Sequence, residues 1–401
     1  MINCPTNPGS RAKLTTGQEK LGEVCEIISP GIKKFEGIKK YVATADVDFD
    51  KIVNFSEITY SNRPSRANME TKENDALVAR MAETKKFLVV SKELQNNYIF
   101  STGFAVLRTK KDLLPKCLFY FLTTKDFNLQ KNKLAVGATQ KAINNPALKR
   151  IKIPILPLPI QQKIVERLDV VKKAQELNDK QIALAEELFQ SLLHRELDPK
   201  GKNWKARRLG EVCEEIYRYP TYYNIKYLKR GIPEIRGELI MKDGTINLNK
   251  KRWRFIDRST SERFPKTQLK SGDVVLSVRG TIGKIGFVPK ELEGSNMTAN
   301  LMRISPNRKR LKPRYFWFFL RSNFFQKSLL NILSSTTITT LRAPALKSLK
   351  ISFPPIEIQR KIVEKLSAVQ DYKKKLLEQK QKLNELFESV LNKSMKRELI
   401  K

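Results

Sequence analysis

The sequence predicts an α+β protein in which two mixed α/β domains alternate with two long helices. Three observations lead to this prediction. The chain repeats itself, each copy ends in a stretch with a coiled-coil seam, and the residues between contain short apolar runs of strand length. The 401 residues are enough for two or three domains with a sizeable core.

The two copies carry the same motifs in the same order. Ile160–Leu168 (IQQKIVERL) recurs 198 residues later as Ile358–Leu366 (IQRKIVEKL), with seven of nine positions identical. A tandem duplication of this kind predicts an internal pseudo-twofold repeat. Further matching segments are Glu187–Leu193 with Glu385–Leu391, Pro146–Lys149 with Pro344–Lys347 and, at an offset of 188, Leu21–Cys25 with Leu209–Cys213.

A 4-3 spacing of apolar residues runs through both predicted helices, and such a seam must face another helix. Polar residues interrupt it at Gln175, Asn178, Lys373 and Lys380, where they could set register at some cost in stability. The helices either pair with each other or pack separately on their own domains, and their matching length favours pairing. The apolar seam residues are Ile164, Leu168, Val171, Ile182, Phe189 and Leu192, then Ile362, Leu366, Val369, Leu376, Leu383, Phe387 and Val390.

Proline-rich stretches precede both helices, at Pro154–Pro159 and Phe353–Pro355. Proline fixes an extended chain and excludes a helix, so these stretches predict rigid joints. Asp198–Asn203 ends the first helix and starts the second copy. The predicted boundaries are 1–153 for the first domain, 154–198 for its hinge and helix, 199–351 for the second domain, and 352–401 for the second hinge and helix.

The segments between the repeated motifs predict strands and short helices. Asp75–Arg80 and Asp273–Arg279 are apolar runs that predict buried strands, each opened by an acidic residue and closed by arginine. Aromatic side chains recur at helical spacing in Leu113–Thr123 and Pro313–Arg321. Because their neighbours are apolar, we expect core packing rather than platforms for base stacking. Tyr98–Phe100 and Phe104–Leu107 are predicted as strands around a turn.

The charge is strongly unbalanced, with 77 Lys+Arg against 41 Asp+Glu and a formal net charge of +36. Such a charge opposes compaction unless a polyanion screens it, and nucleic acid is the obvious polyanion. The alternative is a highly soluble basic protein without that partner. The sequence contains no run of 18 apolar residues and no signal-peptide core, so we expect a cytoplasmic protein.

The motifs of catalysis and of metal or cofactor binding are missing. Gly280–Lys284 lacks the four residues between glycines that a phosphate-binding loop requires, and it predicts a strand–turn–strand instead. The single histidine, His194, is expected near a helix end. We expect Cys25 and Cys213 to be packing residues, and no cofactor. A zinc site is not expected either, because the four cysteines, Cys4, Cys25, Cys117 and Cys213, lack metal-ligand spacing.

The duplicated order resembles the specificity subunit of type I restriction-modification systems. The resemblance rests on the proline-rich hinges with IQQKIVERL and IQRKIVEKL, on LFQSLLHREL at Leu188–Leu197, and on the two LGEVC segments. Ser101–Arg108, Ala138–Gln140 and Arg279–Gly286 resemble other recurring phrases of that family. The likeness covers the chain from Glu19 onward. One departure is that the second REL follows the first by 202 residues rather than 198.

The resemblance implies two target-recognition domains, each reading one half of a split site in double-stranded DNA. It also implies that the two helices pack antiparallel as a spacer between the domains. The implied partners are two methyltransferase subunits and, optionally, endonuclease-translocase subunits, and the chain itself would carry out no chemistry.

Side chains on loops that can enter a groove are the candidates for reading bases. Each could instead contact a phosphate or remain a solvated charge. Arg80 and Arg279 could alternatively pair with a carboxylate at a strand end, and Trp253 is expected to be half-buried. The DNA-binding candidates are Arg63, Ser65, Arg66, Arg80, Lys85, Lys86, Thr139, Gln140 and Lys141 in the first domain, and Lys250, Lys251, Arg252, Arg254, Arg279, Thr281, Lys284, Ser335, Thr336 and Thr337 in the second.

Three hypotheses for the function follow. The leading one is a DNA specificity subunit whose partners perform the chemistry. The second is a DNA-binding enzyme with recognition and methyltransferase or nuclease activity in one chain. The third is a coiled-coil adaptor without a DNA function.

Overall fold

The computed structural model describes residues 17–218, 225–334 and 340–395. They fall into two compact units, and the division cuts both long helices, α6 (Leu158–Leu197) and α12 (Ile356–Met395). The first unit contains α6 up to Asp179 and α12 from Gln379, and the second contains residues 180–378. The boundaries proposed from the sequence differ, because they give each helix whole to one segment.

The first unit contains two four-stranded sheets. One is antiparallel throughout, and the other includes one parallel pair, β3 with β10. The predicted strands at 98–100 and 104–107 are confirmed. They belong to different sheets, so the turn between them connects one sheet to the other and does not form a hairpin. The sheet orders are β2 (Cys25–Ile28), β11 (Phe104–Thr109), β8 (Ala76–Ala79), β9 (Phe87–Val89), and β6 (Ser56–Ile58), β3 (Lys39–Val42), β10 (Tyr98–Ser101), β7 (Ala67–Met69).

Short elements complete the first unit. The predicted helix at 113–123 is confirmed as α3, and its aromatics Phe119, Tyr120 and Phe121 are buried in the core, as expected. The remaining elements are η1 (Thr44–Asp46), the β4 (Val47–Asp48) and β5 (Lys51–Ile52) hairpin, α2 (Lys92–Asn97), α3 (Pro115–Thr123), α4 (Lys125–Leu134) and α5 (Asn145–Lys149).

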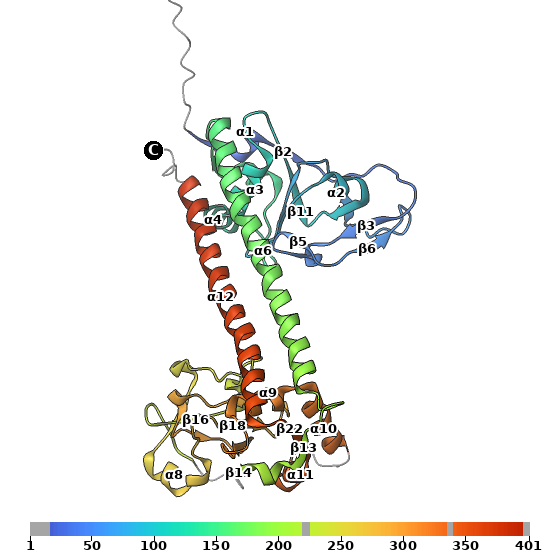
Figure 1. The fold of residues 1–401 in the computed structure, drawn as a ribbon. Helices are drawn as coiled ribbons and strands as arrows, with labels where there is room; N and C mark the ends of the chain where they lie inside the picture. The colour runs from blue at the N-terminus through green and yellow to red at the C-terminus, as the bar shows by residue number, and fades with distance from the viewer. Residues whose placement is uncertain (1–16, 219–224, 335–339, 396–401) are drawn as a thin grey trace, which may run out of the picture. The chain divides into compact units, whose positions relative to one another are not determined.

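The second unit repeats the antiparallel sheet of the first in the same order and contains a second four-stranded sheet. Figure 1 labels several strands of each unit. The buried strand predicted at 273–279 is confirmed as β18, and the helix at 313–321 is confirmed as α9 with its aromatics in the core. The sheet orders are β14 (Cys213–Arg218), β21 (Leu301–Pro306), β18 (Val274–Ser277), β19 (Ile285–Phe287), and β15 (Tyr227–Leu228), β17 (Arg254–Ile256), β16 (Ile232–Ile235), β20 (Asn296–Met297). The helices are α8 (Arg258–Arg263), α9 (Pro313–Arg321), α10 (Asn323–Ser334) and α11 (Ala343–Ser348), with short 3-10 turns η2 (Gly237–Leu239), η3 (Lys250–Arg252), η4 (Pro265–Thr267) and η5 (Lys290–Leu292).

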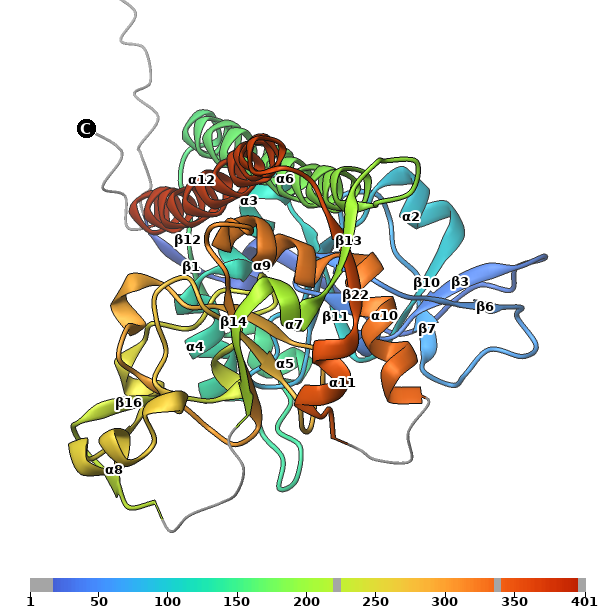
Figure 2. The ribbon, with the colours of Figure 1, turned by 60° about the horizontal axis from the view of Figure 1, so that its bottom comes forward.

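In each unit the repeated LGEV and PALK motifs pack on each other, close to where the domain meets its long helix. In the first unit α1 (Leu21–Val24) packs on α5, next to the strand pair β1 (Gln18–Lys20) and β12 (Lys152–Pro154). A Cβ at Gly22 would lie 2.8 Å from Lys149 Cβ, so this approach requires glycine. The second unit repeats the arrangement with α7 (Leu209–Val212), α11 and the pair β13 (Lys205–Arg208) and β22 (Lys350–Phe353), seen side by side in Figure 2.

The two long helices pair antiparallel inside each unit. In the first unit Gln175 Nε2 donates to Asn384 Oδ1 at 2.9 Å, and Asp179 pairs with Lys380 at 2.7 Å. From the first pair to the second, the residue number rises by four on α6 and falls by four on α12, so the helices run antiparallel. In the second unit Glu186 pairs with Lys373, and Glu196 with Lys365 at 3.2 Å. Three of the polar residues noted in the sequence, Gln175, Lys373 and Lys380, therefore make interhelical contacts.

The seam residues also join the domain cores, so both arrangements considered from the sequence occur together. The end of α12 packs with the start of α6 on the first domain, and the end of α6 packs with the start of α12 on the second. At the helix ends Leu193 and Leu391 are more deeply buried than Leu192 and Val390, as the drift of a 3.6-residue helix predicts. Buried seam residues are Ile164, Leu168, Val171, Phe189, Ile362, Leu366 and Leu376, and half-buried ones are Ile182, Leu192, Val369, Leu383, Phe387 and Val390.

A buried glutamine fixes each helix on its domain. Gln161 accepts from Leu114 N at 2.9 Å, and its amide donates to Asp112 O and Leu156 O. Gln359, 198 residues later, is 0 % exposed and makes the equivalent bonds with Lys312 N, Arg310 O and Pro354 O. The shared glutamine of the two IQ motifs is therefore a hydrogen-bonded clamp.

We expect Gln359→Leu to destabilise the second unit by about 2–4 kcal/mol, because it removes the partner of three backbone groups, one of them buried and two partly buried. Trp204, Trp253 and Trp317 all lie in that unit, so tryptophan fluorescence during urea unfolding reports on it. Arg360→Leu is the matched control in the same unit, since Arg360 is exposed and bonds only Glu357 among the described contacts. An unchanged midpoint for Gln359→Leu would contradict the clamp.

Candidate nucleic-acid interface

Backbone hydrogen bonds bring three distant loops of the first unit together. Thr102 N donates to Arg66 O at 2.9 Å, and Arg80 N donates to Gly103 O at 2.9 Å. The Ser101–Gly103 turn therefore lies between the loop of Arg66 and the hairpin that follows β8. Ala82 N of that hairpin donates to Lys141 O at 2.9 Å, which adds the third loop. Candidates that are up to 78 residues apart in the sequence, from Arg63 to Lys141, thus share one region.

Some candidate side chains in this region make contacts within the protein, and the others are exposed. Arg63 is half-buried and stacks on the Tyr60 ring, with its guanidinium carbon 3.9 Å from the ring centroid. Lys86 Nζ is already engaged and donates to Thr44 O at 2.7 Å. The fully exposed candidates are Ser65, Arg66, Lys85, Thr139, Gln140 and Lys141.

Arg80 points into the protein. Its Nε donates to Phe104 O at 3.2 Å and its Nη1 to Ile143 O at 3.4 Å, and burial lowers its pKa. It therefore joins β11 to the start of α5 and does not pair with a carboxylate. The acidic residue that opens the strand, Asp75, pairs instead with Arg108 of β11 through two bonds of 2.8 Å.

The second unit carries its candidates on two segments. Lys250, Lys251 and Arg252 form η3 and are exposed, and Arg254 lies over the Tyr227 ring at 5.1 Å. Trp253 between them is half-buried and packs on the core, as predicted. Arg236 Nη2 donates to Arg252 O at 2.9 Å and so ties this segment to the end of β16.

The other segment is the hairpin between β18 and β19, which carries Arg279, Thr281 and Lys284 in exposed positions. The strand–turn–strand predicted for Gly280–Lys284 is confirmed. Gly280 and Gly283 take positive φ angles of 69° and 92°, which favour glycine.

The offset of 198 shows that the two hairpins have equal length but different chemistry. Arg80 corresponds to Val278, and Arg279 corresponds to Met81. The two strand-closing arginines, which looked alike in the sequence, therefore occupy different positions. Arg80 is internal, whereas Arg279 is exposed on the turn.

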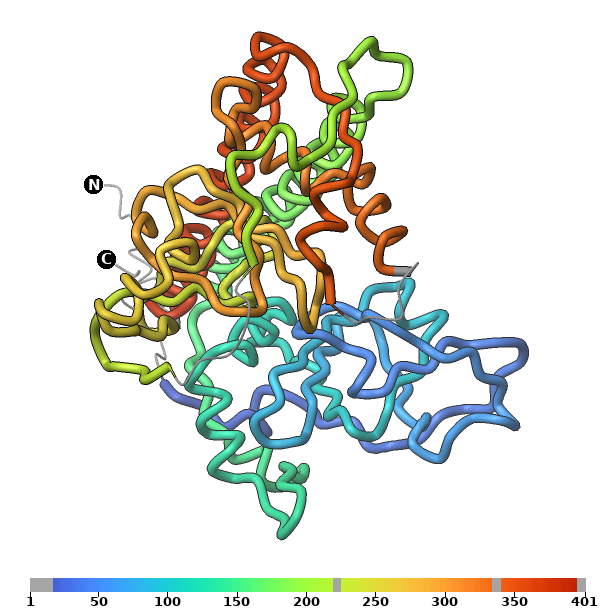
Figure 3. Tube along the Cα trace, turned by 90° about the horizontal axis from the view of Figure 1, so that it is seen from below, coloured from blue at the N-terminus to red at the C-terminus, as the bar shows by residue number. Residues whose placement is uncertain are grey.

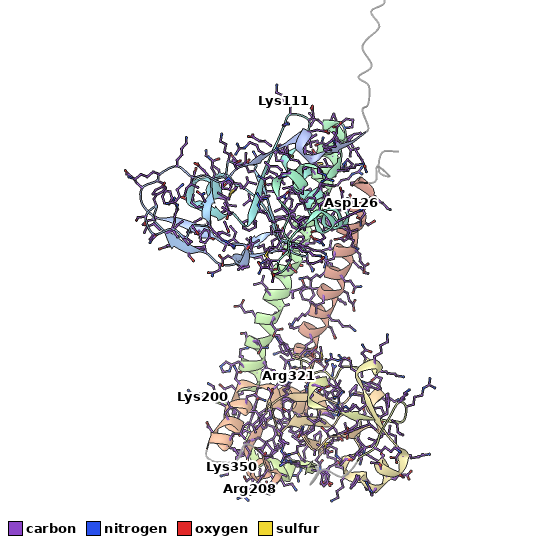
Figure 4. The ribbon with its side chains drawn as sticks, turned by 180° about the vertical axis from the view of Figure 1, so that it is seen from behind. Lys111, Asp126, Lys200, Arg208, Arg321 and Lys350 are labelled. Carbon is purple, nitrogen blue, oxygen red and sulfur yellow. The ribbon has the colours of Figure 1, made fainter. Side chains whose placement is uncertain are left out.

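Ser335, Thr336 and Thr337 lie outside the described residues, as do Cys4 and the second REL at 397–399. β13 is a further basic segment outside the candidates named from the sequence: Lys205, Arg207 and Arg208 are exposed, and Arg208 lies opposite Lys350 of β22 (Figure 4). Its signal in the sequence was the run KARR directly after the helix break.

No constellation suited to catalysis or metal binding is found in the part of the chain that the structure describes. Burial raises the pKa of the Cys25 and Cys117 thiols to about 12, which suits packing residues and not nucleophiles. Among the described residues, no group of three His, Cys, Asp or Glu could hold a metal ion. Within the same residues, no helix is long and apolar enough to cross a membrane.

Comparison with known proteins agrees with this duplicated arrangement. The sequence model of the type I restriction modification DNA specificity domain matches residues 17–187 and again residues 201–387. The chain belongs to the type I restriction-modification specificity subunits. Each match contains two four-stranded sheets with their loops and most of one long helix, so the subunit carries two DNA specificity domains.

Individual relatives are distant in sequence. The MjaVIII type I restriction enzyme specificity subunit of Methanocaldococcus jannaschii is 26% identical over 314 residues, which cover 74% of this chain and 72% of that one. A chain solved in work on complex assembly and conformational transition of the type I R-M system has 24% identity and a TM-score of 0.65, covering 96% and 98%. The S subunit from M. genitalium has 15% identity and a TM-score of 0.59, covering 97% and 98%. These two structures support the fold.

Proposed function

We propose that this specificity subunit reads a split site in double-stranded DNA, one half through each unit. The observation that carries the proposal is the hairpin after β8 and its counterpart after β18, which present exposed cations on the same framework: Lys85 in the first unit, Arg279 and Lys284 in the second. Cations on such turns can contact phosphates and base edges. Because the two turns differ in sequence, the two half-sites can differ.

The net charge of +36 supports the same proposal, since each neutralised phosphate releases a counterion. The individual side chains that touch bases are drawn from the candidates named above, with Arg80 and Lys86 as residues that shape the loops. We infer that the chain performs no chemistry, because it lacks the motifs of methyltransferases and nucleases, and that catalysis belongs to partner subunits.

Partner docking is supported by apolar side chains left exposed on the long helices. On the part of α6 that belongs to the first unit, Val170 and Leu177 follow at seven-residue spacing and are 70% and 52% exposed. This spacing places them on one face, outside the seam, where a further helix would find an apolar stripe. We propose that two methyltransferase subunits, and optionally an endonuclease-translocase, dock on the subunit, and native mass spectrometry of the co-expressed complex tests that stoichiometry.

The test of the function is methylome sequencing of cells with and without the gene for this chain. We expect one split DNA motif to lose its methylation when the gene is deleted, while other methylated motifs stay unchanged. If the purified chain alone transferred labelled methyl groups from S-adenosylmethionine, the fused-enzyme alternative would hold instead. If its DNA affinity did not fall steeply with salt, the adaptor alternative would hold.

A further inference from the structure

A lysine lies buried beneath the reading hairpin of the first unit. Lys131 on α4 is 0 % exposed, and its Nζ donates to Thr84 O at 2.5 Å and to Ala79 O at 3.4 Å. Burial lowers its pKa to about 8, although Glu83 lies near enough to oppose the shift. Burying an ammonium group is costly, and packing alone would be served better by an apolar side chain.

The second unit has that apolar side chain. Leu329 follows Lys131 by 198 residues, lies on the equivalent helix α10, and is 1 % exposed. The two helices align closely, because Thr124 and Ser322 cap them through the same side-chain bond to the third residue on. The fold therefore accepts leucine at this position, and Lys131 is not needed to fill the core.

What differs between the units is the hairpin above this position. Both hairpins have seven residues and are closed by the same backbone bond, Ala79 N to Lys86 O and Ser277 N to Lys284 O. The second hairpin bends at two glycines, and Ser277 Oγ bonds Thr281 O and Lys284 N inside it. The second hairpin thus depends largely on its own glycines and serine, and α10 adds one bond, from Gln326 Nε2 to Gly283 O at 3.2 Å.

The first hairpin contains no glycine, and it places Glu83 at a φ of 60°, a region that is strained for this residue. Helix α4 holds it from outside. Asn132 Oδ1 accepts from Glu83 N at 3.0 Å, and Asn132 Nδ2 donates to Glu83 Oε1 at 2.8 Å. Lys131 Nζ donates to the carbonyl oxygens of Ala79, at the end of β8, and of Thr84, which follows Glu83. Two neighbouring side chains of α4 thus impose the shape that glycines provide in the second unit.

We propose that Lys131 is a positioning residue for DNA reading, which fixes the 80–86 hairpin so that the first unit accepts only its own half-site bases. This inference rests on the proposed function. Lys85 is exposed on that hairpin, so a change in the hairpin's shape moves this cation relative to the bases. A displaced donor loses the geometry of a base contact, which carries most of the discrimination.

The test uses Lys131→Met, which keeps length without charge, and Lys131→Leu, which copies the second unit. Both are made in the full-length chain assembled with its partner subunits. We expect little change in the thermal midpoint, because the loss of two hydrogen bonds to carbonyl oxygens is offset by the removal of a buried ammonium group. Amide hydrogen exchange at residues 80–86 should accelerate. On duplexes altered in one half-site, discrimination should fall about tenfold for the half read by the first unit and not for the other. Leu329→Met is the matched control and should leave discrimination at both halves unchanged.

The outcomes separate the proposals. If hairpin exchange is unchanged in both variants, or if discrimination stays at the wild-type level, Lys131 does not position the hairpin. Equal losses at both half-sites would mean general damage and would also overturn the inference. If the wild-type complex discriminates at neither half, the proposed function itself fails.

Discussion

Exchange of residues 25–144 for the same segment of a related subunit is expected to change one half of the recognised DNA site and to leave the other half and the spacing intact. The segment carries both sheets of the first domain and every exposed reading candidate of that unit. The segments where the domain meets α6 remain native, because Leu21–Val24 and Asn145–Pro154 lie outside the exchanged segment. The sheet therefore keeps its joint with α6 while the loops change. Methylome sequencing of cells that express the chimera gives the new motif.

The exchanged segment must begin at Cys25 so that β2 and its partner strand β11 come from the same protein. An exchange that began after Ile28 would split β2 from β11, its partner along Cys25–Thr109 and Ile28–Val106. The reciprocal exchange in the second unit, residues 213–342, is the matched control and should change only the other half-site. A chimera that alters both halves, or neither, would show that the units do not read independently.

The repeat made the fold predictable because the repeated residues are packing residues. Gln161 and Gln359 make the same three bonds, and Gly22 lies against Lys149 in a joint that the second copy rebuilds. Motifs that recur at a fixed offset therefore marked places where the helix meets its domain. The positions of β8 and β18 followed from their apolar runs, since every residue of these two strands is buried.

The division into units could not be predicted in the same way. A heptad seam reports that a helix has a partner, but α6 and α12 each have two, the other helix and a domain core. The site was also only partly predictable. An arginine at a strand end looks the same whether it points inward like Arg80 or outward like Arg279. Lys131 went unnoticed because its meaning depends on Leu329 at the corresponding place, a comparison that needs the two hairpins side by side.

Lengthening both helices by one heptad is expected to lengthen the unread spacer of the DNA site by about 3 base pairs. A heptad adds about 10.5 Å of helix, and a base pair occupies about 3.4 Å. The insertions belong after Asp179 in α6 and before Lys380 in α12, because these two residues face each other at 2.7 Å. Figure 3 follows the chain as a Cα trace coloured from the N-terminus to the C-terminus. Insertions at points that do not face each other would shift the pairs between them, such as Gln175 with Asn384.

The half-site sequences should stay the same, because no reading loop is touched. The variant should bind its longer site less tightly than the unaltered subunit binds the native site, since 3 base pairs also turn one half-site by about 100° around the DNA axis. Two inserted residues in each helix are the control, because they rotate the seam by about 200° out of the interface and should destabilise the protein. The methylome of cells with the heptad variant gives the spacing. A folded variant that still prefers the native spacing would show that the helices do not set the distance, which would then depend on contacts with partner subunits.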